Sequence, residues 1–262
     1  MTTPLVLLHG FLGSSADFEP LMDGLMPDHP SVAVDLPGHG PDPEPLPADA
    51  TFDEVVEGLR AFLAQIETPQ IDILGYSMGG RIAMGLLLAE PERVRRAVLV
   101  GASPGIEDEA ARATRAELDE ARAQALETQP FEDWLEDWYG QPLFAPLREH
   151  PGFAEVLARR LQGRPEALAQ AVRVLSPSRQ PPLRQRLATA PVRALLMAGA
   201  LDERYAASNR ALADANPHFE SVTVPGAGHA PHLEQPDEFL DAVRHFLDRD
   251  GGPADLPLGV RG

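Results

Sequence analysis

Short apolar runs alternate with amphipathic stretches along most of this chain, and this alternation restricts the possible folds more than any other feature. Continuous apolar runs are typical of parallel strands that are covered on both faces of a sheet. The expected strands are Pro4–Leu8, Val32–Leu36, Ile71–Leu74, Ala97–Val100, Val192–Met197 and Ser221–Val224. The expected helices are Phe18–Leu25, Phe52–Gln65, Arg81–Ala89, Ala206–Ala215 and Pro236–Leu247. This order predicts an α/β fold with a mostly parallel sheet flanked by helices.

One long segment, residues 106–187, interrupts the alternation because it contains no strand pattern. It is rich in Ala, Leu, Glu and Arg and is punctuated by Gly and Pro, as expected for several helices joined by turns. We therefore expect a helical cap, 106–187, inserted into a core made of residues 1–105 and 188–249. Residues 250–262, rich in Gly, Pro and Asp, are expected to form a flexible tail.

The composition and charge of the chain exclude several classes of function. None of the 262 residues is cysteine, which excludes disulfide scaffolds, cysteine-ligated metals and thiol catalysis. The formal net charge is −18, and all 22 basic residues are arginine. A field of that sign repels phosphate backbones and anionic lipid, so we expect neither nucleic acid nor membrane as a partner. Without a signal-peptide pattern, we expect a cytoplasmic monomer or small homo-oligomer.

The motif that carries chemistry is Gly75-Tyr76-Ser77-Met78-Gly79, which has the form G-x-S-x-G. It directly follows the expected strand Ile71–Leu74 and precedes an expected helix, and this context gives the motif its meaning. The small flanking residues allow a sharp turn that exposes the Ser77 hydroxyl, and the helix start supplies a backbone N–H and a positive dipole end. The pattern predicts Ser77 as a nucleophile or base.

A serine hydroxyl needs a partner that accepts its proton, and the downstream sequence offers one. His229 follows the last expected strand, where its loop returns over Ser77; His232 is the competing histidine, which we interpret as structural. The orienting acid falls between serine and histidine in such chains, and Asp202 fits that order, with Glu203 as the alternative carboxylate. The sequence therefore predicts a Ser77–His229–Asp202 triad.

Backbone N–H groups near Ser77 are expected to stabilise a developing negative charge. A Gly-rich turn, His9-Gly10-Phe11-Leu12-Gly13, follows the first expected strand and can present the N–H of Phe11. The N–H of Met78, directly after Ser77, is its expected partner in this oxyanion hole. His9 itself is interpreted as a packed, hydrogen-bonded residue beside the site.

These motifs together resemble the α/β-hydrolase superfamily. The residues that carry the resemblance are His9-Gly10, Asp35-Leu36-Pro37-Gly38-His39-Gly40, Gly75-Tyr76-Ser77-Met78-Gly79-Gly80 and Gly228-His229. The resemblance spans the core and implies the α/β-hydrolase fold and a catalytic triad. It does not fix the reaction, because members of this superfamily catalyse many reactions.

A narrower resemblance is to the 2-succinyl-6-hydroxy-2,4-cyclohexadiene-1-carboxylate synthases, a family of menaquinone-pathway lyases. The residues that carry it are Arg81, Gly101-Ala102-Ser103-Pro104-Gly105, Arg112, Arg115 and Trp134-Leu135-Glu136-Asp137-Trp138-Tyr139-Gly140-Gln141-Pro142-Leu143-Phe144. One departure is Gly199-Ala200-Leu201-Asp202, where the family usually has a glutamate after the glycine, although Asp202 itself is kept. The resemblance implies that Arg81, Arg115 and Arg160 bind substrate carboxylates, and that Tyr76 and Trp138 form walls of the pocket.

The resemblance implies a lyase that eliminates pyruvate from a cyclohexene bearing several carboxylates. In that mechanism His229, held by Asp202, takes the Ser77 proton, and the Ser77 oxygen removes a proton from a ring carbon next to a carboxylate. No metal or organic cofactor is expected, and the partner is a small polycarboxylate substrate. Two alternatives remain open: a carboxylesterase or carbon–carbon bond hydrolase with the same triad, and a non-catalytic binding protein of this fold.

Overall fold

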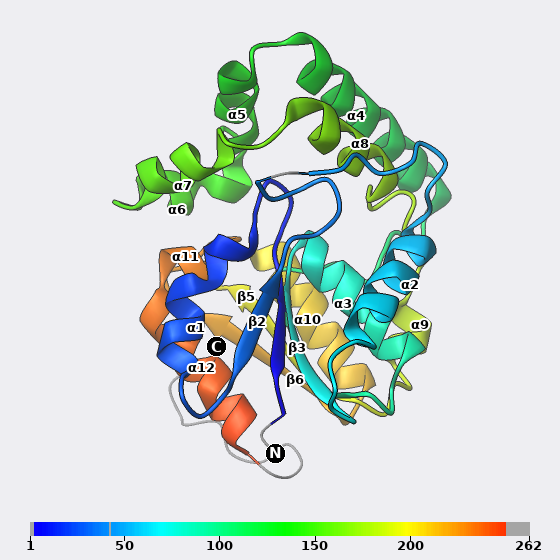
Figure 1. Cartoon of the computed structure of the whole chain (residues 1–262), viewed down its shortest axis with the longest axis vertical. Coiled ribbons are helices and arrows are strands. Elements are labelled where there is room, and N and C mark those ends of the chain that lie inside the picture. The colour runs from blue at the N-terminus through cyan, green and yellow to red at the C-terminus, as the bar shows by residue number, and fades with distance from the viewer. Residues whose placement is uncertain (1–2, 42, 250–262) are drawn as a thin grey trace.

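A six-stranded parallel sheet forms the centre of the computed structural model, which describes residues 3–41 and 43–249 (Figure 1). The strands are β1 (Leu5–Leu8), β2 (Ser31–Val34), β3 (Ile71–Tyr76), β4 (Val94–Val100), β5 (Arg193–Gly199) and β6 (Phe219–Val224). Their order is β2-β1-β3-β4-β5-β6, and every neighbouring pair is parallel. The expected mostly parallel sheet is therefore confirmed.

Helices cover both faces of the sheet, and this explains why the strands carry apolar residues on both faces. In β1, Leu5 and Leu7 pack with one layer of helices, and Val6 and Leu8 pack with the other, because side chains alternate along a strand. The first layer consists of α1 (Glu19–Leu25) and α12 (Pro236–Asp248). The second consists of α2 (Phe52–Leu63), α3 (Met78–Ala89), α9 (Arg184–Leu187) and α10 (Glu203–Ala215).

Strand β4 begins three residues before the expected start. Two arginines in its first three residues interrupt the apolar pattern on which the prediction rests. Arg95 donates from Nε to Oδ1 of Asp72 in the neighbouring β3, at 2.9 Å. Arg96 donates to the backbone carbonyls of Leu247 and Arg249 at the end of α12. The charges are satisfied by partners far away in sequence, which a local pattern does not reveal.

The segment between β4 and β5 forms helices that lie over the carboxyl ends of the strands (Figure 1). They are α4 (Glu109–Thr128), α5 (Phe131–Tyr139), η2 (Pro142–Phe144), α6 (Ala145–Glu149), α7 (Phe153–Arg160) and α8 (Pro165–Val174). Their apolar side chains form a further cluster around Trp134, Leu135 and Leu168, which also includes Leu12 and Ala230 from the core. Whether these helices behave as a separate domain stays a prediction, and the expected tail, 250–262, lies outside the described residues.

The short helix α9 departs from the expected cap, since it packs with the core. Leu183 donates its backbone N–H to the carbonyl of Pro104 at 2.7 Å, which returns the chain to the end of β4. Leu187 then packs among the side chains of α2 and α3. Two further short elements complete the fold: η1 (Ser15–Phe18) after β1 and α11 (Pro231–Glu234) after β6. No helix within residues 3–41 and 43–249 is both long and apolar enough to cross a bilayer.

Candidate active site

Ser77 lies alone between the end of β3 and the start of α3, in the turn that the G-x-S-x-G motif predicts. Its backbone φ is 51°, in the left-handed region that residues with a side chain rarely adopt. The glycines on both sides are required, because a Cβ on Gly75 would overlap the backbone of Gly79, and a Cβ on Gly79 would overlap the carbonyl of Leu8. The turn therefore projects the Ser77 hydroxyl beyond the sheet.

The side chains of Ser77, His229 and Asp202 are hydrogen-bonded in sequence. His229 Nε2 lies 3.1 Å from Ser77 Oγ, and His229 Nδ1 lies 2.7 Å from Asp202 Oδ2. Because Asp202 accepts from Nδ1–H, Nε2 is left as the acceptor that faces the serine. Asp202 also caps α10 by accepting the backbone N–H of Tyr205 at 3.4 Å, whereas the alternative acid, Glu203, is exposed. The geometry thus brings the three predicted residues together.

The loop that carries His229 is held by a residue that sequence reasoning missed. The carboxylate of Glu234, which is buried, accepts the backbone N–H of Gly228 and that of Ala230, the latter at 3.0 Å. Burial raises the pKa of Glu234, and these N–H groups oppose that shift by stabilising the charged form. The signal in the sequence is an acid that ends the short helix after the histidine.

His232, the competing histidine, packs against aromatic rings. Its ring centroid lies 4.4 Å from that of Tyr76, and the side chain is buried. Burial lowers the pKa of His232 to about 4, so the ring is neutral at neutral pH. The structural interpretation of this residue agrees with its position.

The two predicted oxyanion donors flank Ser77. Met78 is the first residue of α3, where backbone N–H groups have no partner within the helix, and Phe11 lies in the turn after β1. His9 fixes that turn, since its Nδ1 donates to the carbonyl of Gly10 at 2.7 Å and its Nε2 accepts the N–H of Leu36 at 3.0 Å. Burial lowers the pKa of His9, which keeps this neutral tautomer in place.

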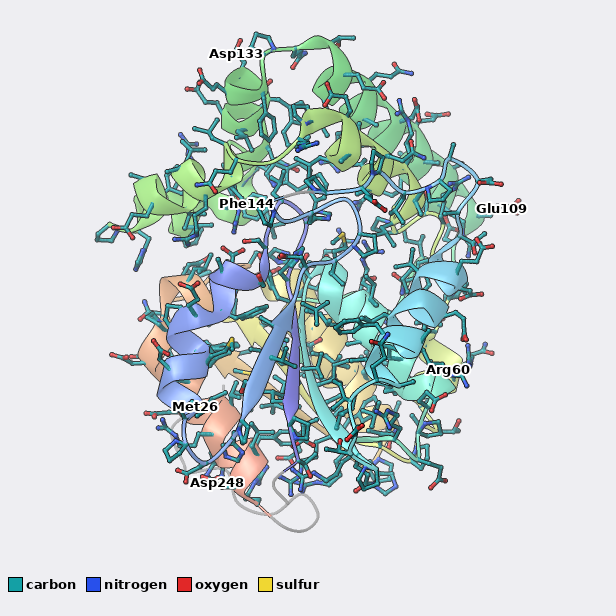
Figure 2. All side chains as sticks on the ribbon, in the orientation of Figure 1. Met26, Arg60, Glu109, Asp133, Phe144 and Asp248 are labelled. Carbon is teal, nitrogen blue, oxygen red and sulfur yellow. The ribbon has the colours of Figure 1, made fainter. Side chains whose placement is uncertain are left out.

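A cavity of about 420 Å³ opens at the triad, between the strand ends and the inserted helices. From the core it is lined by Phe11, Ser77, Met78, Arg81 and the loop residues Asp202, Arg204, Tyr205 and His229. From the inserted helices it is lined by Arg115, Leu118, Asp119, Arg122, Trp138, Gln141 and several apolar residues around Phe144. Phe144 lies between these helices and the sheet (Figure 2), with its ring 5.9 Å from that of His229.

Arg81 supplies a buried positive charge in this cavity. The side chain begins in the first turn of α3, and the residue is 8% exposed. Its guanidinium donates to the carbonyl of Leu175 at 2.6 Å and to the amide oxygen of Gln180 at 3.2 Å, and both partners are neutral. Burial lowers the pKa of Arg81 to about 10, so it remains charged at neutral pH. A cation so placed favours an anionic ligand next to Ser77.

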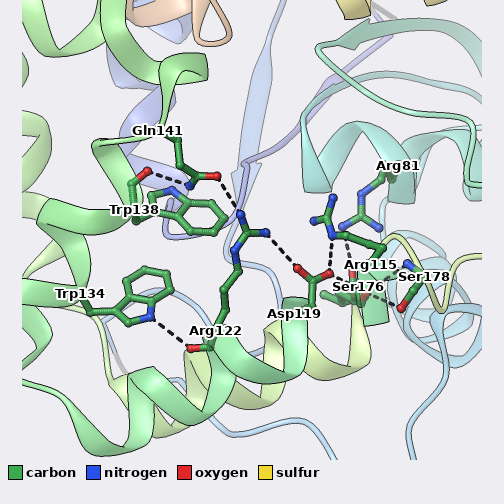
Figure 3. A network of polar contacts seen from close by, with 10 residues as sticks. Arg81, Arg115, Asp119, Arg122, Trp134, Trp138, Gln141, Ser176 and Ser178 are labelled. Carbon is green, nitrogen blue, oxygen red and sulfur yellow. Dashed lines mark hydrogen bonds and ion pairs between the residues drawn. The ribbon is translucent and has the colours of Figure 1, made fainter. Parts of the chain in front are cut away.

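Arg115 and Trp138, both predicted, line the cavity with two residues that the sequence reasoning did not select, Asp119 and Arg122. Arg115 donates from Nε to Asp119 at 2.7 Å, and Arg122 donates from Nη1 to Asp119 at 3.0 Å (Figure 3). The guanidinium carbon of Arg122 lies 5.0 Å from the centroid of a Trp138 ring. The spacing 115, 119, 122 places all three side chains on one face of a helix, and that spacing is the signal that could have found them.

Two residues expected to contact substrate, Tyr76 and Arg160, do not line the cavity. Arg160 is 5% exposed and forms a two-pronged ion pair with Asp17, at 2.8 Å and 2.7 Å, and also donates to the hydroxyl of Tyr139 at 3.1 Å. Its charge is already neutralised by a carboxylate from η1, so its guanidinium is occupied within the protein. Tyr76 packs between His229 and His232.

A parallel sheet, a serine in a left-handed turn after β3, and a histidine–aspartate pair after β6 and β5 together define an α/β-hydrolase. The chain belongs to the alpha/beta hydrolase family, whose sequence model matches residues 5–242.

Within that family the chain is similar to several 2-succinyl-6-hydroxy-2,4-cyclohexadiene-1-carboxylate synthases. It is 35% identical to the one from Enterobacter sp. (strain 638), over 88% of this chain and 86% of that protein. It is 33% identical to the one from Serratia proteamaculans (strain 568), over 94% of both. It also matches the Arabidopsis thaliana protein PHYLLO, chloroplastic, at 33% identity, but spans only 15% of that longer protein.

Solved structures agree with the sequence relatives. MenH from S. aureus superposes with a TM-score of 0.89 and 31% identity, covering 94% of each chain. A thermophilic esterase from Thermogutta terrifontis superposes with a TM-score of 0.79 at 22% identity, over 94% of this chain and 90% of that one, and supports the fold alone.

Proposed function

We propose that this protein is a lyase of menaquinone biosynthesis. It converts 2-succinyl-5-enolpyruvyl-6-hydroxy-3-cyclohexene-1-carboxylate into 2-succinyl-6-hydroxy-2,4-cyclohexadiene-1-carboxylate and pyruvate. The observation that carries the proposal is Arg81, a buried cation with neutral partners beside Ser77, in a protein whose net charge is −18. Since the protein as a whole repels anions, cations inside the cavity are needed to hold a polycarboxylate. The similarity to synthases of this name supports the same conclusion.

The triad serves as a base in this reaction. His229, oriented by Asp202, takes the proton of Ser77, and the Ser77 oxygen removes the proton from the ring carbon that bears the succinyl group. The electron pair of that C–H bond forms a ring double bond, the existing double bond shifts, and the bond to the enolpyruvyl oxygen breaks. The enolate leaves and becomes pyruvate once protonated. The N–H groups of Phe11 and Met78 stabilise negative charge as it develops, and such donors contribute about 10²–10³-fold each.

The test is the release of pyruvate from this substrate, measured beside an enzyme-free control that corrects for spontaneous decay. The wild type should accelerate release strongly, and Ser77→Ala should lose at least about 10²-fold, the usual contribution of a general base. Full activity in Ser77→Ala would exclude serine as the base. No acceleration by the wild type would exclude the lyase proposal itself.

Hydrolysis of a carboxylic ester is the second candidate, because the triad and the expected N–H pair also suit acyl transfer. Arg81 distinguishes the two reactions. Arg81→Ala should reduce kcat/KM for the lyase reaction by about 10–100-fold, the usual loss when a hydrogen bond to a charged group is removed. Turnover of a neutral ester should be affected little, since it presents no carboxylate to this arginine.

A further inference from the structure

A carboxylate in the wall of the cavity conflicts with a site for carboxylates. Asp119 lines the cavity from α4 and is only 3% exposed. A buried negative charge at this place opposes the binding of an anion, since the attraction and repulsion of charges are strong where water is excluded. The proposed mechanism gives Asp119 no role. Its presence in the site therefore needs a separate explanation.

The contacts of Asp119 provide that explanation. Its Oδ2 accepts from Arg115 Nε at 2.7 Å and from the Ser176 hydroxyl at 2.7 Å, and its Oδ1 accepts from Arg122 Nη1 at 3.0 Å. Asp119 thus lies between two guanidinium groups and holds one with each oxygen (Figure 3). Ser176, which follows α8, fixes the carboxylate from the other side.

Among the residues that the structure describes, Arg122 has more partners than Arg115. Its Nη2 donates to the amide oxygen of Gln141 at 2.7 Å, and the Gln141 amide in turn donates to the carbonyl of Trp138 at 2.8 Å. The indole of Trp138 supports the guanidinium at 5.0 Å and stacks on Trp134, with ring centroids 5.2 Å apart. The guanidinium of Arg122 is thereby held by hydrogen bonds along its edge and by the Trp138 ring against its face.

Three positive charges share this part of the cavity, and they oppose one another. Burial lowers the pKa of Arg122, the charge of Asp119 opposes that change, and Arg115 lowers it further. Arg115 also contributes to the lowered pKa of Arg81. Without the carboxylate between them, Arg115 and Arg122 would repel each other and turn toward solvent. With it, Arg81, Arg115, Arg122 and Asp119 together carry two net positive charges, and the guanidinium groups of Arg115 and Arg122 are held in place.

We propose that Asp119 is a positioning residue, which holds Arg115 and Arg122 as a fixed pair that binds a second carboxylate of the substrate, apart from the one at Arg81. The contact of Arg115 with Asp119 uses Nε, so, within the part of the chain that the structure describes, its terminal amino groups are left for the ligand. The inference rests on the proposed function in one respect, namely that the ligand carries more than one carboxylate.

Asp119→Asn tests the proposal because two explanations of this residue predict opposite changes in KM. If Asp119 only adds negative charge, the variant makes the cavity more positive, and KM for the substrate falls. If Asp119 positions the arginines, KM rises by about tenfold or more, as for the loss of hydrogen bonds between charged groups, and kcat changes less. Glu120→Gln is the matched control, since Glu120 adjoins Asp119 on α4, is exposed and pairs with Arg173. It changes the net charge equally and should leave KM unchanged.

Ser176→Ala is a second variant that changes no charge. It removes one hydrogen bond from Asp119 and should raise KM by a smaller factor than Asp119→Asn does. Arg122→Lys should not behave as wild type, because lysine lacks the planar fork that contacts Asp119 and Gln141 together. A fall in KM in Asp119→Asn, or equal KM values in all variants, would overturn the proposal.

A binding measurement separates this inference from the proposed reaction. Labelling of Ser77 by a fluorophosphonate is followed while phthalate, an aromatic dicarboxylate, is added as a protecting ligand. Asp119→Asn should need about tenfold more phthalate than wild type for the same protection. That result stands even if the wild type releases no pyruvate, in which case only the proposed reaction fails. Equal protection in both proteins, or no protection of the wild type, would overturn the positioning role.

Discussion

Ser77 shows how a single residue can carry a conformational cost for function. A left-handed backbone at a residue with a side chain costs about 1–3 kcal/mol and persists only where its surroundings require it. Here the N–H of Ser77 donates to the carbonyl of Val100 at 2.7 Å, and the N–H of Gly79 donates to that of His9 at 3.1 Å. The neighbouring strands β1 and β4 thus hold the turn from both sides.

Gly79→Ala should disrupt this turn. An added Cβ would overlap the backbone of Leu8 and His9, and backbone atoms cannot move aside as a side chain can. We expect at least about 3 kcal/mol of destabilisation, measured as a lower Tm with loss of Ser77 labelling by a phosphonate. Gly58→Ala is the control, because no atom lies within 4 Å of a Cβ there and α2 favours alanine. Unchanged labelling in Gly79→Ala would contradict the requirement for glycine.

Asp202→Asn should leave the fold intact and slow the chemical step. Asparagine can present its amide to His229 Nδ1 and so favour the tautomer that places a proton on Nε2, which then cannot accept from Ser77. The expected loss in single-turnover rate is about 10³–10⁴-fold. Glu203→Gln, a change at the exposed neighbouring acid, should retain wild-type rates. A loss below about tenfold in Asp202→Asn would exclude an orienting role.

The sequence identifies these residues to different degrees, for physical reasons. Ser77 lies in a motif whose geometry is local, so the strand and the helix beside it suffice to predict its turn. Asp119 and Glu234 act through contacts with other side chains or with backbone N–H groups, and their residue type alone does not reveal this. Arg160 is the opposite case, because the resemblance implies that it binds substrate. The sequence around it does not reveal that Asp17, far away in the chain, neutralises its charge.

At the scale of elements, a buried ion pair connects the inserted helices to the sheet. Asp17 of η1 accepts from Arg160 at the end of α7, and also from Arg159 at 3.3 Å. Burial alone would raise the pKa of Asp17, but the charge and hydrogen bond of Arg160 outweigh it, helped by His232 and Arg159, so the pKa is lowered. The folded state therefore favours the ionised carboxylate.

Asp17→Asn should weaken this connection by about 3 kcal/mol, because it leaves Arg160 buried without its counter-ion. A lowered pKa in the folded state contributes stability above the ordinary carboxyl pKa, and the contribution is lost as pH falls through the folded value. The difference in Tm between wild type and variant should thus be largest near neutral pH and shrink in acid. Asp248→Asn, in an exposed pair with His29, should change Tm little. A difference that grew in acid would contradict this account.

Element boundaries are the part of the fold that local sequence predicts least well. Helix α10 begins at Glu203, three residues before the apolar pattern suggests, because the side chain of Asp202 caps it. The same side chain orients His229, so the boundary follows from the site. The order of strands and helices, by contrast, follows directly from the apolar periodicity.

The whole molecule combines a strongly negative surface with a positive cavity. The net charge of −18 implies repulsion within the folded state, which salt screens over about 10 Å at 0.1 M. The cavity arginines lie inside, close to a bound ligand, where screening is weaker. An anionic ligand is therefore repelled by the molecule as a whole at long range and attracted by the cavity arginines at short range.

Raising NaCl from 10 mM to 1 M should stabilise the protein. Screening removes repulsion among the excess acidic groups, and we expect Tm to rise by about 2–4 °C, equivalent to about 1 kcal/mol. The same series at a pH where the net charge is near zero is the control and should show a smaller rise. An unchanged or falling Tm at neutral pH would contradict the role of repulsion.

The cavity draws its residues from two lengths of chain, and this has an evolutionary consequence. Ser77, Asp202 and His229 follow β3, β5 and β6, whereas Arg115 and Trp138 come from the segment inserted between β4 and β5. Mutations in that segment can alter which molecules enter without touching the proposed acid–base centre. On the proposed function, selection can therefore change the substrate by altering this segment alone, and variants that exchange only this segment should keep the proton-transfer residues.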